Sequence, residues 1–107
     1  MPAITVIATA HAKPGRGNEL LGEMKKNVLP VHQEPGCLHY SLHQASDDPD
    51  TIVVIERWAS EDAITAHGQA PHMAAFRERA APLRAAPTEV RRYLMIPAEG
   101  LPEKMRF

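Results

Sequence analysis

Hydrophobic and polar residues alternate with a period of two in four stretches of the chain, and this pattern predicts four β-strands. Turn residues rich in proline, glycine and aspartate separate the stretches. The strands are expected at residues 3–12, 37–45, 51–58 and 89–96. The connection at residues 46–50 has the length of a hairpin loop, so the second and third strands are expected to pair antiparallel.

Apolar residues at helical spacing predict an amphipathic helix at residues 17–29, where Pro30 is expected to end or kink it. A second helical region follows the third strand, with Ser60 as its expected N-cap. Gly68 and Pro71 interrupt this region. A further helical segment is expected to follow, with its core positions at Met73, Phe76, Ala80 and Leu83.

The predicted order β-α-β-β-α-β is typical of an α+β ferredoxin-like sandwich, in which both helical regions cover one face of a four-stranded antiparallel sheet. We expect a single domain at residues 1–97 and a C-terminal tail at residues 98–107, where little periodicity remains. Several strands are apolar on both faces, and a second copy of the sheet is the simplest cover for the other face. The sequence therefore predicts a homodimer.

Composition narrows the possible functions further. Twelve basic and thirteen acidic residues are mixed along the 107-residue chain, so no basic stripe indicates a nucleic-acid partner. No stretch approaches the roughly 20 apolar residues of a membrane helix. The N-terminus does not resemble a signal peptide, and the one cysteine, Cys37, cannot form an internal disulfide. We therefore expect a reduced, cytoplasmic, soluble protein without a membrane partner.

Among the six histidines, His67 and His72 are the candidate catalytic residues. His67 shares a helical stripe with Ala63 and Ile64, so its ring should point toward the sheet. An imidazole there could act as a general base, or it could be a core histidine bound to a backbone carbonyl. His72 lies in the first turn after Pro71, where it could assist or simply border the helix N-terminus.

Alternation places Glu56 and Trp58 on one apolar strand face. Glu56 is expected either to orient a histidine or to anchor the structure, because buried carboxylates are rarely left unpaired. Trp58 could form an aromatic wall for a substrate or belong to the core. Three further residues are expected to line a pocket, core or dimer contact: Tyr40, Met73 and Phe76.

Cys37, His39 and His43 lie on one face of the second predicted strand, opposite to the face that carries Tyr40. Together they raise the question of a metal site. His39 and His43 lie about 13 Å apart along a strand, so they are not expected to share an ion. Cys37 and His39 alone would make an incomplete zinc site. We predict no metal site. No glycine-rich nucleotide loop is present, so neither nicotinamide nor a nucleotide-linked flavin is indicated.

Three short motifs resemble the antibiotic biosynthesis monooxygenase family, and most closely its small bacterial quinol monooxygenases. They are Glu34-Pro35-Gly36-Cys37, Ile55-Glu56-Arg57-Trp58 and Ala66-His67-Gly68-Gln69-Ala70-Pro71-His72-Met73. The resemblance covers about residues 4–97. It implies a dimeric α+β barrel, a pocket between each sheet and its helices, and oxygen chemistry without flavin, metal or nicotinamide.

The same family includes polyketide-oxidising, haem-degrading and isomerising branches, so membership leaves the reaction open. The first two branches use a pocket asparagine, whereas Asn18 and Asn27 both lie on the first predicted helix. This departure favours the quinol branch. We therefore expect a monooxygenase without cofactor that oxidises a hydroquinone or polycyclic phenol with dioxygen. The alternatives are an isomerase or epimerase of a small oxygenated metabolite and a non-catalytic binder of aromatic or haem-like ligands.

Overall fold

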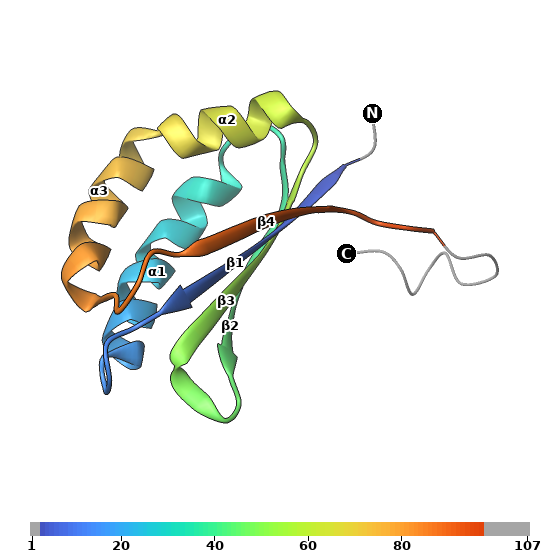
Figure 1. The fold of residues 1–107 in the computed structure, drawn as a ribbon. Coiled ribbons are helices and arrows are strands. Elements are labelled where there is room, and N and C mark those ends of the chain that lie inside the picture. Colours follow the sequence, from blue (N-terminus) through green and yellow to red (C-terminus); the bar gives the residue numbers. More distant parts are fainter. Residues whose placement is uncertain (1–2, 98–107) are drawn as a thin grey trace.

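A computed structural model of the protein describes residues 3–97, and the expected tail at residues 98–107 lies outside them. The chain alternates strands and helices in the predicted order (Figure 1). The elements are β1 (Ile4–His11), α1 (Gly17–His32), β2 (Cys37–Ala45), β3 (Asp48–Trp58), α2 (Glu61–Gln69), α3 (Pro71–Ala80), the 3₁₀ turn η1 (Ala81–Leu83) and β4 (Glu89–Leu94).

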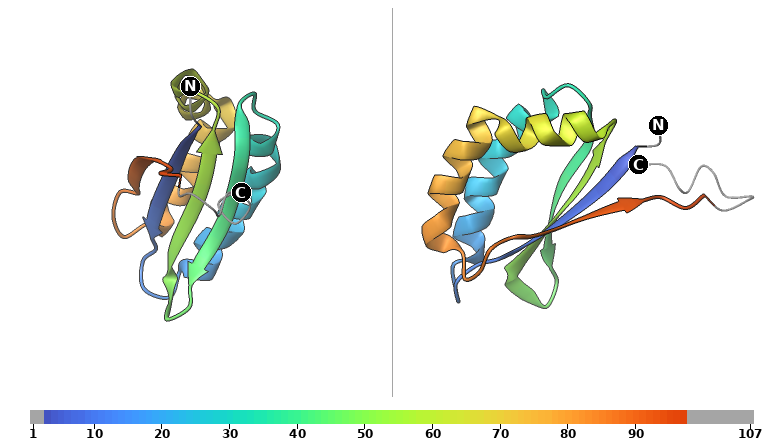
Figure 2. Two further views of the ribbon diagram at one scale, coloured as in Figure 1. Left: turned by 90° about the vertical axis from the view of Figure 1, so that its right-hand side faces the viewer. Right: turned by 45° about the horizontal axis from the view of Figure 1, so that its top comes forward.

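The four strands form one antiparallel sheet in the order β2-β3-β1-β4. Both views in Figure 2 place the three helices on the same face of this sheet. This arrangement is the predicted ferredoxin-like α+β fold. Within residues 3–97, no helix has the length and apolar character needed to span a membrane.

Burial alternates along the central strands as the sequence predicted. On β3, Ile52, Val54, Glu56 and Trp58 are buried toward the helices, while the residues between them are partly exposed. Glu56 lies opposite Val6 of β1 and Tyr40 of β2, so it occupies the middle of the covered face. A carboxylate at the centre of an apolar sheet needs hydrogen-bond partners. One of them is Trp58, whose Nε1 donates to Glu56 Oε1.

Several predicted boundaries differ from the structure. β1 is one residue shorter at each end than predicted, β4 ends at Leu94 and not at Ile96, and α2 continues through Gly68 to Gln69. β3 begins at Asp48 and not at Thr51, because the Asp48 carboxylate accepts hydrogen bonds from Asp50 N (3.0 Å) and Thr51 Oγ1 (2.7 Å) and so orders the start of the strand. Helix α1 continues through Pro30 to His32. Its last turn is held by fully buried Val31 and by His32, whose Nε2 lies 2.8 Å from the Tyr40 carbonyl oxygen.

The turn between α1 and β2 packs closely against α2. Gly36 has a φ of 87°, a conformation that residues with a side chain rarely adopt. A Cβ atom at Gly36 would lie 2.6 Å from the Cβ of Ala63 on α2. Gly36 thus allows the turn that begins with Glu34 to lie directly beside α2, which carries His67.

Candidate active site

A cavity of about 560 Å³ lies between the covered face of the sheet and the helices. Its walls are mostly apolar and come from all four strands of the sheet and from α1, α2 and α3. Five residues singled out from the sequence line it: Tyr40, Glu56, His67, Met73 and Phe76. A cavity of this kind suits a small, largely apolar ligand that is oriented by a few polar groups.

Glu56 is one of these polar groups, and it is 6% exposed. Its Oε1 accepts a hydrogen bond of 2.9 Å from Trp58 Nε1 and lies 3.9 Å from His67 Nε2. Burial raises the pKa of Glu56 above its ordinary value, and the Trp58 hydrogen bond and His67 only partly oppose this shift. Burial therefore favours the neutral carboxylic acid, which can donate as well as accept a hydrogen bond.

Trp58 contacts His67 but is not among the residues that line the cavity. Its indole is fully buried, and its ring centroid lies 4.6 Å from that of His67 at an interplanar angle of 36°. Tyr40 approaches His67 edge-on at 6.2 Å. Burial, reinforced by the charges of Glu56 and Glu34, raises the pKa of Tyr40, so its hydroxyl stays protonated. These rings restrict the orientation of the imidazole.

The carboxylate of Glu34 joins the two candidate histidines. His67 Nδ1 lies 2.9 Å from Glu34 Oε2 and 3.1 Å from Oε1, and His72 Nε2 lies 2.7 Å from Oε2. In the sequence, Glu34 stands out only as part of a turn and as a residue of the family-like motif. Its position between Pro30 and the Pro35-Gly36 turn carries no periodic signal, so spacing alone could not assign it to this site.

The contact with Glu34 determines which nitrogen of His67 is available. A carboxylate only accepts hydrogen bonds, so Nδ1 of His67 carries the proton that it donates to Glu34. In the neutral ring Nε2 is then an acceptor, and it lies on the side of Glu56, another residue of the cavity wall. In this tautomer of the neutral ring, the geometry leaves Nε2 as the acceptor nitrogen at an apolar cavity.

His72 does not line this cavity. It borders a separate hollow of about 350 Å³ together with Asn27, Pro30 and other residues of α1 and α3. Glu34 links His72 to His67, which does line the cavity. Asn27 is also buried, and its Nδ2 lies 2.8 Å from the Met73 sulfur, so this asparagine supports a wall residue without lining the cavity itself.

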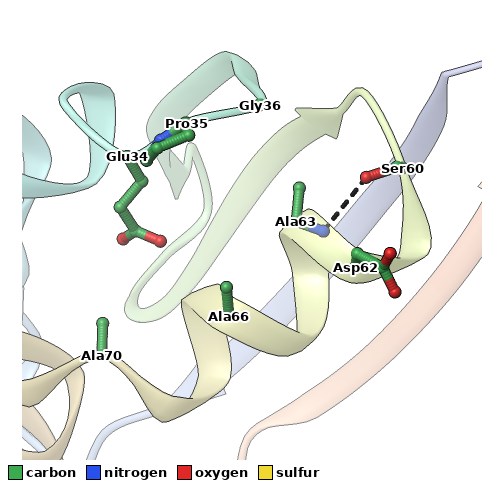
Figure 3. A pocket seen from close by; sticks show the side chains of 8 residues that line it. All are labelled: Glu34, Pro35, Gly36, Ser60, Asp62, Ala63, Ala66 and Ala70. Atoms are coloured by element: carbon green, nitrogen blue, oxygen red, sulfur yellow. Dashed lines mark hydrogen bonds between the residues drawn. The ribbon is translucent and has the colours of Figure 1, made fainter.

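A third hollow, of about 520 Å³, is lined in part by Glu34. Figure 3 shows the Glu34 side chain extending from the turn toward helix α2. Three alanines of the α2 region face this turn: Ala63, Ala66 and Ala70. Their small side chains leave space in front of the Glu34 carboxylate.

Three arginines, Arg77, Arg84 and Arg92, line the same cavity as His67. Arg92 pairs with Glu61, whereas Arg77 donates to the Gly68 carbonyl oxygen at 2.7 Å. Arg84 lies 3.4 Å from the Thr88 hydroxyl. Positive charge at the cavity favours a bound anion over its neutral parent.

The expected separation of His39 and His43 applies to their backbones only. The Nε2 atoms of both residues lie 2.8 Å from Ser41 Oγ, so the two rings converge on the shared hydroxyl. The prediction that distance keeps their nitrogens apart was therefore wrong. The reason is that residues two and four positions along a strand project from the same face, and long side chains can lean toward one another.

Comparison with known proteins agrees with this fold. The sequence pattern of the antibiotic biosynthesis monooxygenase family matches residues 3–79. The chain belongs to this family.

Individual relatives support the same family assignment. The chain is 36% identical to the Escherichia coli K12 protein named "Probable quinol monooxygenase YgiN", over 70% of this chain and 82% of that protein. It also resembles the crystal structure of PA3566 from Pseudomonas aeruginosa, with 29% identity and a TM-score of 0.85 over 91% of this chain and 97% of that one. The structure of Rv0793 from Mycobacterium tuberculosis has 24% identity and a TM-score of 0.81, covering 92% and 99% of the two chains, and shares the fold.

Proposed function

We propose that this protein is a monooxygenase without cofactor that oxidises a hydroquinone or polycyclic phenol with dioxygen. The observation that carries the proposal is the basic Nε2 of His67 at an apolar cavity, with Nδ1 bound to the Glu34 carboxylate. The similarity to a protein named as a probable quinol monooxygenase supports the substrate class.

In the first step, His67 Nε2 takes the proton of a substrate hydroxyl. An imidazole is suited to this role near neutral pH, and a general base typically contributes about 10²–10⁴-fold to the rate. The imidazolium that forms donates to the Glu34 carboxylate through Nδ1, and this charge-assisted hydrogen bond stabilises it. Arg77 and Arg84 favour the resulting substrate anion.

The electron-rich anion then reduces dioxygen by one electron, and the two radicals combine at a ring carbon that bears hydrogen. The peroxide takes a proton back from His67. Loss of the carbon-bound proton breaks the O–O bond, which leaves a C=O group on the substrate and releases the other oxygen as water. All electrons come from the substrate, so the sequence balances without an external reductant.

The protein's contribution is orientation, deprotonation and exclusion of water. Met73 and Phe76 supply apolar walls, and Trp58 and Tyr40 fix the imidazole ring. Glu56, whose pKa is raised by burial, lies close to His67, where it can form a hydrogen bond with a substrate oxygen. His72 positions Glu34 rather than contacting the substrate.

The test is oxygen uptake by the protein with a panel of dihydroxynaphthalenes and anthrones, corrected for autoxidation. Uptake above the blank, with one atom of ¹⁸O₂ in the quinone product, is the expected result. Turnover that continues without oxygen would instead support an isomerase with the same histidine as its base. Saturable binding without turnover in air or under nitrogen would support a ligand-binding protein.

A further inference from the structure

We propose that Glu34, His67 and His72 form a binding site for a divalent transition-metal ion such as Zn²⁺, and that the bound ion switches off the base. The donors are a carboxylate oxygen of Glu34, Nδ1 of His67 and Nε2 of His72, and all lie within 4.8 Å of one another. The switching part of the proposal rests on the proposed function, whereas the binding part does not.

The donor set matches the chemistry of zinc. Zn²⁺ accepts imidazole nitrogen and carboxylate oxygen at about 2.0–2.2 Å, usually from three protein ligands and a water molecule in open sites. Ligands at those lengths around a tetrahedral ion lie roughly 3.3–3.6 Å apart. The Glu34 oxygen now lies 2.9 Å from His67 Nδ1 and 2.7 Å from His72 Nε2, so a small outward movement of the side chains makes room for the ion.

The break between helices α2 and α3 makes this convergence possible. His67 and His72 are five residues apart, and on one continuous helix they would point about 140° away from each other. Ala70, with φ −64° and ψ 139°, interrupts the helix between them. Both rings can therefore reach the same carboxylate, which comes from the turn before β2.

The site is sheltered but has space beside it. The side chains of Glu34 and His67 are each 11% exposed and that of His72 is 29% exposed. The hollow shown in Figure 3 reaches Glu34, and the hollow near Asn27 reaches His72. Lys26 and Arg79 also border the second hollow, but both form ion pairs with Glu23, which reduces their repulsion of a cation.

Metal binding and base catalysis require opposite states of His67. The proposed base carries its proton on Nδ1 and keeps Nε2 free. An ion on Nδ1 replaces that proton, and the neutral ring then holds its proton on Nε2, where it can no longer accept one from the substrate. The ion also binds the Glu34 carboxylate, whose charge would otherwise stabilise the imidazolium.

The binding test is a Zn²⁺ titration of the apo protein against a chromophoric chelator at pH 7.5, with thermal melting to show that each variant is folded. We expect one ion per chain and at least about 10-fold weaker binding in His72→Ala and His72→Gln, since even the loss of a residue that only supports a ligand typically weakens metal binding 10–100-fold. His43→Ala is the matched control, because it removes the other converging histidine pair and should leave this affinity unchanged.

Two results would overturn the site: affinity that is unchanged in both His72 variants, or affinity that is lost in His43→Ala. These results do not depend on turnover, so failure of the proposed function would not imitate them. The switch is tested separately with a quinol that the protein oxidises. Turnover should fall in proportion to zinc occupancy and recover with a chelator, and full turnover at full occupancy would overturn the switch.

Discussion

The Glu34 carboxylate lies 2.9 Å from Nδ1 of His67, although the two residues are 33 positions apart in the sequence. One residue comes from the turn before β2 and the other from helix α2. This contact fixes the tautomer of the imidazole and leaves Nε2 at the cavity. Because of this contact, the inward-pointing His67 is a candidate base.

Glu34→Gln should lower kcat for quinol oxidation about 10- to 100-fold, because a hydrogen bond to a charged group contributes about 1.5–3 kcal/mol. The glutamine amide keeps the size of the side chain but removes the charge that stabilises the imidazolium. KM should change much less than kcat, because Glu34 is not among the residues that line the cavity. A kcat equal to that of the wild type would show that the charge plays no part in the reaction.

The sequence predicted the fold well because the fold depends on local periodicity. The alternation on β3 and the stripe that contains His67 both identified residues that face the interior. The site was predicted only in part. Glu34 lies in a turn without periodicity, and its partners are known only once the turn is packed against α2. For the same reason, spacing alone could not show that His67 and His72 border different spaces.

Gly36→Ala should destabilise the fold more than Gly15→Ala. Both glycines have positive φ, at 87° and 79°, so each substitution incurs the left-handed backbone cost of about 1–2 kcal/mol. Only at Gly36 does the new methyl group meet a neighbour, the Ala63 Cβ at 2.6 Å. This overlap should add about 1–3 kcal/mol.

Urea unfolding of both variants measures the difference. Ala63→Gly alone should cost about 0.5–1 kcal/mol because Ala63 lies in helix α2. Relative to Ala63→Gly, adding Gly36→Ala should then cost only the backbone part. Equal destabilisation by Gly15→Ala and Gly36→Ala would mean that the close approach of the turn to α2 does not constrain the structure.

Glu56 should make the protein less stable as the pH rises. Its pKa is raised above 4.5 in the folded chain by burial, so between 4.5 and the raised value the folded state holds a proton that the unfolded state has released. The contribution of Glu56 to the free energy of unfolding is therefore fully present below about pH 4.5. It is lost as the pH rises through the raised pKa.

Glu56→Gln removes the ionisable group and keeps an acceptor for Trp58 Nε1. Its free energy of unfolding should improve relative to wild type as the pH increases from 4.5 to 8, as measured by urea unfolding at several pH values. Parallel pH profiles for the two proteins would contradict the raised pKa.

We also propose that the protein is a homodimer that packs through the open face of the sheet. Ile55 is partly exposed on β3, and its side chain projects opposite to buried Val54 and Glu56. Tyr93 on β4 is 44% exposed. Ile55→Asp would place a charge in the dimer contact and should shift the protein to monomer in sedimentation at micromolar concentration. A wild-type protein that sediments as a monomer would refute the dimer.

The most direct test of the proposed base is the initial rate of oxygen uptake by His67→Ala, beside the wild type and His43→Ala, with the best quinol of the panel. His43 is exposed and is not among the residues that line the cavity, so its variant controls for the loss of a histidine. We predict that uptake falls at least about 10²-fold in His67→Ala, the lower end of a general base's contribution, and is unchanged in His43→Ala. Wild-type uptake by a folded His67→Ala protein would contradict the assignment of His67 as the base.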